Sequence, residues 1–131
     1  MYDDSEDLRH QPNQFFHWSY TFPGQTTSTS LGQTCNWYFF NEECMLSTAQ
    51  SSKDANIIRY PEMLLTAAEG IARTSGVTSE AAGYLAQVKA RASLTGKTAA
   101  EFEAELLLLS KDNFIKEVLA ERLREFPLEF L

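Results

Sequence analysis

The sequence has little of what metal, redox and cofactor chemistry requires. Its only cysteines are Cys35 and Cys44, and its only histidines are His10 and His17. None of them forms the close ligand pairs that are typical of zinc sites. The two thiols are expected to be free or buried, or to close a short loop as a disulfide if the protein is exported. We therefore expect no metal site and no cofactor.

Positive charge and long apolar runs are also scarce. The chain has 11 Lys and Arg against 18 Asp and Glu, a formal net charge of −7. Binding to nucleic acid or to an anionic membrane surface needs clustered cations, so neither is expected. No apolar run reaches the ~18 residues of a membrane-spanning helix. The acidic residues 1–10 lack the features of a signal peptide, so the chain is either cytoplasmic or a fragment of a longer protein.

The composition changes near residue 56, which predicts two regions. Residues 1–56 hold ten of the 16 aromatic residues and both tryptophans. They are predicted to form loops and short strands. Residues 57–131 hold most of the leucine, alanine, glutamate, lysine and arginine, and are predicted to be helical. The expected fold class is mainly α.

The aromatic segment contains two runs that are typical of strands. In the first, residues 15–22, strict alternation would place Phe16, Trp18, Tyr20 and Phe22 on one side of a strand. The second run covers residues 35–40. We expect the two runs to pair as a hairpin across the polar loop 23–32, which is longer than a usual hairpin connection.

Helix-capping residues predict four helices in the second region. Proline is tolerated in a first turn, Ser and Thr cap helix N-termini, and glycine favours a left-handed stop. The expected boundary residues are, in order, Pro61, Gly76, Thr78 or Ser79, Thr98 in a capping box with Glu101, Ser110 and Pro127. The first two helices, of about 14 residues each, are joined by about three residues and must be antiparallel. Such a pair resembles a tetratricopeptide unit.

The spacing of apolar residues predicts which side of each helix faces the core. The expected inward positions are Met63, Leu64, Ala67, Ala68, Ile71 and Ala72 in the first helix; Ala81, Leu85, Val88 and Ala92 in the second; Phe102, Leu106 and Leu109 in the third; and Phe114, Ile115, Val118, Leu119, Leu123 and Phe126 in the fourth. The glutamates Glu101, Glu103, Glu105, Glu121 and Glu125 are expected at exposed helix positions. No catalytic pair of carboxylates and no nucleophile motif is recognisable, so no catalysis is expected.

Three motifs in the helical region resemble the SusD/RagB family of outer-membrane nutrient-binding proteins. Residues 58–70, IRYPEMLLTAAEG, are similar to the family pattern L-R-Y-A-E-x-L-L-x-x-A-E-A. Residues 86–94, AQVKARASL, are similar to N-x-V-R-x-R-A-G-L, and residues 121–126, ERLREF, are similar to E-R-x-x-E-L/F. The departures are Pro61, Lys89 and Ser93. The likeness runs from about Asp54 to Phe130 and extends more loosely to the aromatic segment.

The resemblance implies that the chain is a C-terminal fragment of a longer protein. Residues 1–56 and 57–131 would both belong to one SusD/RagB-type domain with tetratricopeptide-like helix pairs, truncated at both ends. The whole protein would be a surface-exposed lipoprotein of the outer membrane that binds an oligosaccharide or another nutrient for polysaccharide utilization. Its partner would be a SusC-like, TonB-dependent barrel transporter. A helix pair without its neighbouring repeats should expose apolar faces, so we expect poor solubility or self-association.

Charged residues in the three motifs are interpreted as structural rather than ligand-binding. Opposite charges on facing antiparallel helices can pair, and motif residues inside a helical repeat usually maintain packing. The expected ion-pair residues are Arg59, Glu62, Glu69, Arg91, Glu121 and Arg122.

The aromatic segment is the better candidate for ligand contact. Trp and Tyr rings offer a flat apolar surface with a hydrogen-bonding tip, which suits a sugar ring, and amides can bind hydroxyl groups. The candidate residues are Trp18, Tyr20, Asn36, Trp37 and Tyr38. Equally, these aromatics could form the core that joins the irregular segment to the helices. Two other functions stay open: a helical-repeat module that binds a protein or peptide, and a small acidic enzyme.

Overall fold

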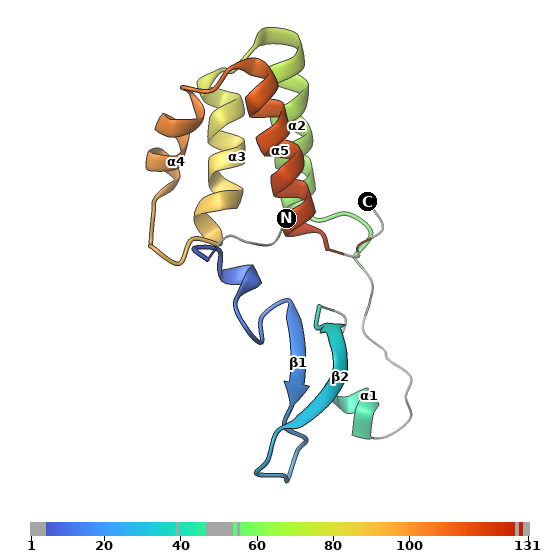
Figure 1. Cartoon of the computed structure of the whole chain (residues 1–131). Coiled ribbons are helices and arrows are strands. Elements are labelled where there is room, and N and C mark those ends of the chain that lie inside the picture. The colour runs from blue at the N-terminus through green and yellow to red at the C-terminus, as the bar shows by residue number, and fades with distance from the viewer. Residues whose placement is uncertain (1–4, 39, 47–53, 55, 128, 130–131) are drawn as a thin grey trace. The chain divides into compact units, whose positions relative to one another are not determined.

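The structure is a computed structural model that describes residues 5–38, 40–46, 54, 56–127 and 129. The described elements are, in order, a short 3-10 helix η1 (Leu8–His10), strands β1 (Phe16–Tyr20) and β2 (Thr29–Asn36), and helices α1 (Glu42–Leu46), α2 (Tyr60–Ser75), α3 (Ser79–Arg91), α4 (Ala99–Leu106) and α5 (Lys111–Glu125). Figure 1 shows them along the chain. The predicted mainly α fold, with an aromatic-rich region of short strands before the helices, is confirmed.

The chain divides into two compact units. The helical unit contains the segment up to Arg9 together with the chain from Ile58 onward, and the aromatic lobe is His10–Ile57. Among the described residues, no helix is long and apolar enough to cross a membrane.

The helix boundaries in the helical unit follow the predicted capping residues. Pro61 lies in the first turn of α2, and Gly76, with φ 83°, ends that helix. The hydroxyls of Thr78 and Ser110 accept hydrogen bonds from backbone N–H groups in the first turns of α3 and α5. Thr98 forms a complete capping box at α4. These caps satisfy backbone N–H groups that have no partner within their helix.

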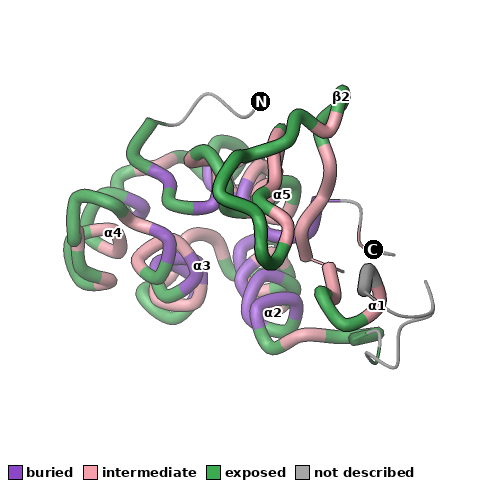
Figure 2. The backbone as a smooth tube through the Cα atoms, turned by 90° about the horizontal axis from the view of Figure 1, so that it is seen from below, coloured by how far each residue is buried: buried purple, intermediate pink, exposed green. Residues whose placement is uncertain are grey.

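The four helices pack around an alanine-rich core. α2 contacts α3 and α5, and α3 also contacts α4 (Figure 1). Buried residues lie along α2 and α3 in Figure 2. The fully buried core residues are Leu65, Ala68, Ala72, Ala81, Ala82, Leu85, Ala86, Phe114 and Val118. The small alanine side chains let α2 and α3 approach closely, while Phe114 and Leu65 fill the remaining space.

The prediction that three residues face the core is wrong. Met63 is 57% exposed, and Leu119 and Leu123 are 42% and 47% exposed. On α5 the side chains that face inward instead of Leu119 and Leu123 are Glu121 and Glu125, which are 1% and 0% exposed. The expectation that these two glutamates lie at the surface is therefore also wrong. Both continue the inward helical spacing that begins with Phe114 and Val118, and cations neutralise them there.

The aromatic lobe contains the predicted hairpin, with an irregular register. β1 and β2 are antiparallel, pairing Phe16 with Asn36 and Tyr20 with Thr29. The register shifts between His17 and Ser19. β2 begins at Thr29, inside the segment expected to be a loop, so the connection is shorter than predicted. Only the first two residues of the second aromatic run belong to the strand.

Candidate functional site

The aromatic lobe is organised around the indole ring of Trp37. His17 stacks on it with ring centroids 4.0 Å apart, and Phe40 stacks on it at 4.1 Å. Two nearly parallel rings at these distances would overlap on one face, so His17 and Phe40 cover opposite faces of Trp37. Tyr20 packs against Trp37 and Phe40 at inclined angles, and Phe22 meets Tyr20 edge-on. We call these five residues the aromatic stack.

The aromatic stack brings together two residues of β1 that are three apart. His17 and Tyr20 both contact Trp37, although residues three apart in a regular strand point to opposite faces. The sheet has an irregularity beside them, because Trp18 alone stands opposite four residues of β2, between the pairs His17–Cys35 and Ser19–Ser30. That Trp18 and Tyr20 share one side of the strand stays a prediction.

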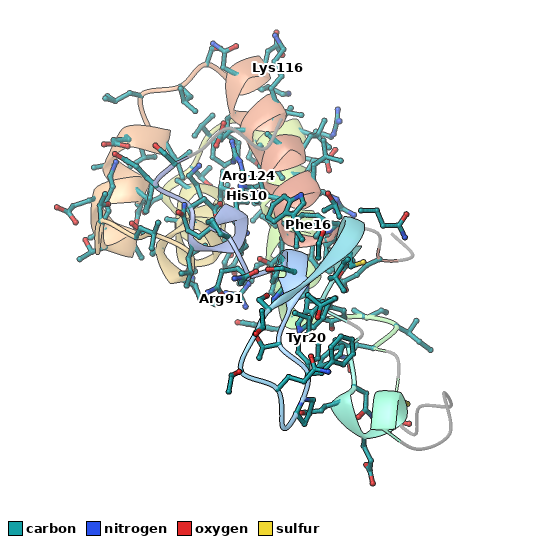
Figure 3. All side chains as sticks on the ribbon, turned by 60° about the horizontal axis from the view of Figure 1, so that its bottom comes forward. His10, Phe16, Tyr20, Arg91, Lys116 and Arg124 are labelled. Carbon is teal, nitrogen blue, oxygen red and sulfur yellow. The ribbon has the colours of Figure 1, made fainter. Side chains whose placement is uncertain are left out.

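Trp18 lies at this irregularity and is 50% exposed. It is the one exposed aromatic among the described residues of the lobe, since the others are half-buried. Figure 3 shows the side chains, with Phe16 and Tyr20 of β1 labelled. Trp18 is thus the ring in the lobe that is best placed to meet a ligand from solvent.

The polar candidates in the lobe have partners within it. Asn36 Oδ1 accepts the backbone N–H of Tyr38 at 2.8 Å. The hydroxyl of Tyr38 accepts a hydrogen bond from Asn56 Nδ2 at 3.0 Å. Desolvation and the neighbouring Glu42 carboxylate raise the pKa of Tyr20. All five predicted ligand residues therefore lie in one lobe, but both faces of Trp37 are covered by protein rings. Their role in ligand binding stays a prediction.

A second group of functional interest, which we call the ion cluster, lies inside the helical unit. It joins five cations to five anions: Arg9, Arg59, Lys89, Arg91 and Arg124 to Asp7, Glu117, Glu121, Glu125 and Glu129. Arginine dominates the cations, and its planar fork can serve two carboxylates at once. The equal numbers leave the cluster formally neutral, which makes its burial tolerable.

Glu125 is the most heavily paired carboxylate of the cluster. Its Oε2 accepts from Arg9 at 2.7 Å, and its Oε1 accepts from Arg59 at 2.8 Å and also from Arg91. Burial alone would raise the pKa of Glu125, but the hydrogen bonds from Arg91 and Arg59 outweigh it and lower the pKa. Glu125 is therefore held as a carboxylate and is unsuited to donate a proton as a general acid.

Arg9 connects Glu125 to the rest of the cluster. Its Nη2 donates to Glu121 at 2.7 Å, and its Nε donates to Asp7 at 2.9 Å. Glu121 also accepts from Arg124 at 2.9 Å. Burial lowers the pKa of Arg9, but hydrogen bonding to Asp7 and the charge of Glu121 outweigh it and raise the pKa.

Each of the six residues expected in structural ion pairs has an oppositely charged partner. Arg59 also reaches Glu129, Glu62 pairs with Arg122 on α5, and Glu69 pairs with Arg73 one helical turn later. Arg91 and Glu121 belong to the ion cluster.

Sequence reasoning missed the partners Asp7 and Arg9. The available signal was the spacing of Glu121 and Glu125, which continues the apolar face of α5 and therefore requires buried cations from elsewhere.

Neither group has the composition of a metal centre. In the described part of the chain, no three or more His, Cys, Asp or Glu residues are placed to hold a metal ion. Cys35 and Cys44 are both free thiols.

The architecture is that of a mainly α protein with an aromatic-rich lobe, in which the three motifs of the helical region meet at one buried ion cluster. Residues 10–130 match the family model described as the SusD family, and the chain belongs to this family. The match covers the aromatic lobe as well as the helices. Proteins of this family are nutrient-binding and generally non-catalytic. No match was found among curated proteins or solved structures.

Proposed function

We propose that this chain forms part of the nutrient-binding component of a TonB-dependent uptake system of the outer membrane, with an oligosaccharide as the ligand class. The observation that carries the proposal is the match to the SusD family over residues 10–130. The whole protein would be a lipoprotein exposed on the cell surface and would deliver its ligand to a SusC-like barrel transporter. Binding and release suffice for this role, so no covalent chemistry is required.

Within the lobe, we assign the stacking platform to Trp18. Its side chain is half exposed, whereas the indole of Trp37 has protein rings on both faces. In this assignment Trp37 and Tyr20 support the platform from within the aromatic stack. Asn36 and Tyr38 would offer polar groups at the edge of the lobe.

Calorimetric titration and a glycan array with the full chain test this assignment. Trp18→Ala should weaken oligosaccharide binding about three- to tenfold, which corresponds to roughly 1 kcal/mol for one aromatic contact. The matched control is Tyr60→Ala, which removes a ring that is 71% exposed on the helical unit and should leave affinity unchanged. Binding of peptides but of no carbohydrate would overturn the glycan assignment. A barrel-transporter gene directly upstream would support the proposed partner.

The alternative is a helical module that binds a protein or peptide, and one surface of the helical unit favours it. A groove of about 250 Å³ on α5 is lined by Leu119, Arg122, Leu123 and Phe126. Leu119 and Leu123 are 42% and 47% exposed there, which suits an apolar side chain of a partner. A Leu119→Ser/Leu123→Ser variant that loses peptide binding, while Trp18→Ala retains it, would select this alternative.

A further inference from the structure

Two chain segments connect the helical unit to the aromatic lobe, one before and one after the lobe. An arginine in each connection donates a hydrogen bond to the carboxylate of Glu125. Arg9 is the last residue before the lobe, and its Nη1 donates to Oε2 of Glu125 at 2.7 Å. Arg59 follows the lobe by two residues, and its Nη1 donates to Oε1 of Glu125 at 2.8 Å. The second amino group of Arg59 donates to the backbone oxygen of Glu125 at 2.7 Å.

The first connection is held by its backbone to the residues that follow α3. The N–H of Leu8 donates to the carbonyl of Ala92 at 2.7 Å, and the N–H of Leu94 donates to the carbonyl of Glu6 at 2.8 Å. Asp7 and Ser93 form the antiparallel bridge between these two bonds. These bonds set the path of the connection, and the Arg9 side chain fixes its end.

The second connection is held by the guanidinium group of Arg59. It lies over the ring of Phe126, 4.6 Å from the centroid, and donates to Glu129 as well as to Glu125. The carbonyl of Arg59 accepts the N–H of Glu62 at 3.0 Å and so begins α2. A displaced Arg59 would therefore loosen the first turn of α2.

Glu125 differs from its neighbours in the ion cluster. It is 0% exposed, so water does not replace a lost partner. Glu121 reaches only the first connection, through Arg9, and Glu117 pairs with Lys89 and Arg124 and reaches neither. The lowered pKa of Glu125 fits a carboxylate that stays charged between its arginines.

We propose that Glu125 is a positioning residue that fixes the two points at which the chain leaves and re-enters the helical unit around the aromatic lobe. One buried carboxylate, with one oxygen for each connection, makes the two connections depend on each other. This role goes beyond the proposed function, because it concerns how the lobe is attached and not what it binds.

Hydrogen–deuterium exchange of the full chain, read by mass spectrometry, tests the proposal. In Glu125→Gln, amides near Leu8 and Leu94 and the amide of Glu62 should all exchange at least tenfold faster, while those of the α2–α3 core stay protected. Glu117→Gln is the matched control: it is the same substitution in the same cluster and helix, and it should change neither connection. Faster exchange at only one connection, or at neither, would overturn the proposal. Because the readout needs no ligand, its failure is distinguishable from failure of the proposed function.

Glu125→Gln could also prevent folding, which loss of the thermal transition would show. In that case the same exchange is measured in Arg9→Gln, Arg59→Gln and the double variant. A shared anchor makes the two effects non-additive, with the double variant changing less than the product of the single ones. Additive effects would show two independent attachments and would overturn the proposal.

Discussion

The helical unit and the aromatic lobe are held together by different kinds of contact. The helical unit buries leucine, alanine and phenylalanine together with charged groups such as Arg9 and Glu125. In the lobe, none of the described residues is fully buried, and its organisation comes from rings stacked on Trp37. The unit that looks ordinary by composition therefore contains the buried charges, and the aromatic-rich unit keeps one of its tryptophans half exposed. Burial thus distinguishes the helical unit from the aromatic lobe.

The largest loss in the free energy of unfolding of the helical unit is expected from replacing Arg9. Arg9→Met leaves Glu121 and Glu125 buried with fewer partners, which should lower the free energy of unfolding by about 3–5 kcal/mol. The control is Arg73→Met, because Arg73 is exposed and its pair with Glu69 is worth at most about 1 kcal/mol. Urea unfolding followed by far-UV circular dichroism measures both. Equal losses would mean that the ion cluster contributes no more than a surface pair.

Acid is expected to lower the stability of the helical unit more than that of the aromatic lobe. Burial raises the pKa of Glu117 and Glu125, but hydrogen bonds from Lys89 and Arg91 outweigh it and lower both values. Because the folded pKa values lie below the unfolded ones, the stability they contribute is complete above the ordinary carboxylate value of about 4.3. It is lost as the pH falls through the folded values.

The two units can be followed by different signals in such a titration. Both tryptophans, Trp18 and Trp37, lie in the lobe, whereas far-UV circular dichroism reports mainly on the helices. The urea midpoint of the helices should fall between about pH 5 and pH 3, while that of the tryptophan fluorescence changes less. Helix stability that stays constant or rises on acidification would contradict this prediction.

Within the lobe, Trp37 and Trp18 should behave differently. Trp37→Ala removes two stacked contacts of about 0.5–1.5 kcal/mol each and should destabilise the lobe by roughly 1–3 kcal/mol. Trp18→Ala should change its stability by less than about 0.5 kcal/mol, because Trp18 is half exposed. Thermal unfolding, read by the fluorescence of the remaining tryptophan, compares them. A greater loss in Trp18→Ala would place Trp18 in the core of the lobe.

A smaller effect is expected at the capping box of α4. Thr98→Ala removes the hydroxyl that accepts the N–H of Glu101, and should cost about 1 kcal/mol in the helical unit. Thr74→Ala is the control, since the hydroxyl of Thr74 bonds only to carbonyls of its own exposed turn and to the hydroxyl of the adjacent Ser75. Chemical unfolding of the two variants distinguishes them. An equal cost would show that the cap contributes nothing specific.

The smallest change in stability of the helical unit is expected on the exposed face of α5. Leu119→Ser combined with Leu123→Ser should alter the free energy of unfolding by less than about 1 kcal/mol. If this face causes self-association, light scattering should show a smaller mass for the variant at the same concentration. Leu108→Ser, at a leucine that is 85% exposed in the turn between α4 and α5, is the control. A monomeric parent chain would contradict the expected self-association.

The sequence predicted best what depends on neighbouring residues. The helix ends at Gly76, Thr78, Thr98 and Ser110 follow from local hydrogen bonding, so the capping residues located them. The hairpin was also predictable from its aromatic runs. Its register was not, because the residues that shift it lie in the part of β2 whose polar composition predicted a loop.

The inward side of α5 could not be predicted from hydrophobicity. Leu119 and Leu123 are more apolar than Glu121 and Glu125, yet the glutamates are inside because Arg9 and Arg59 meet them there. Those cations come from parts of the chain far from α5 in sequence. A pattern confined to α5 can indicate that buried cations are needed, but it does not identify which residues supply them.

The bond between Arg9 and Glu121 joins residues 112 positions apart. During synthesis, the hairpin of β1 and β2 can close early, whereas Arg9 cannot meet Glu121 or Glu125 until α5 has been made. Contacts of such long separation are slow to form, since the chain between them must first be brought together. The helical unit is therefore expected to complete its folding last, with the lobe already formed between its two connections.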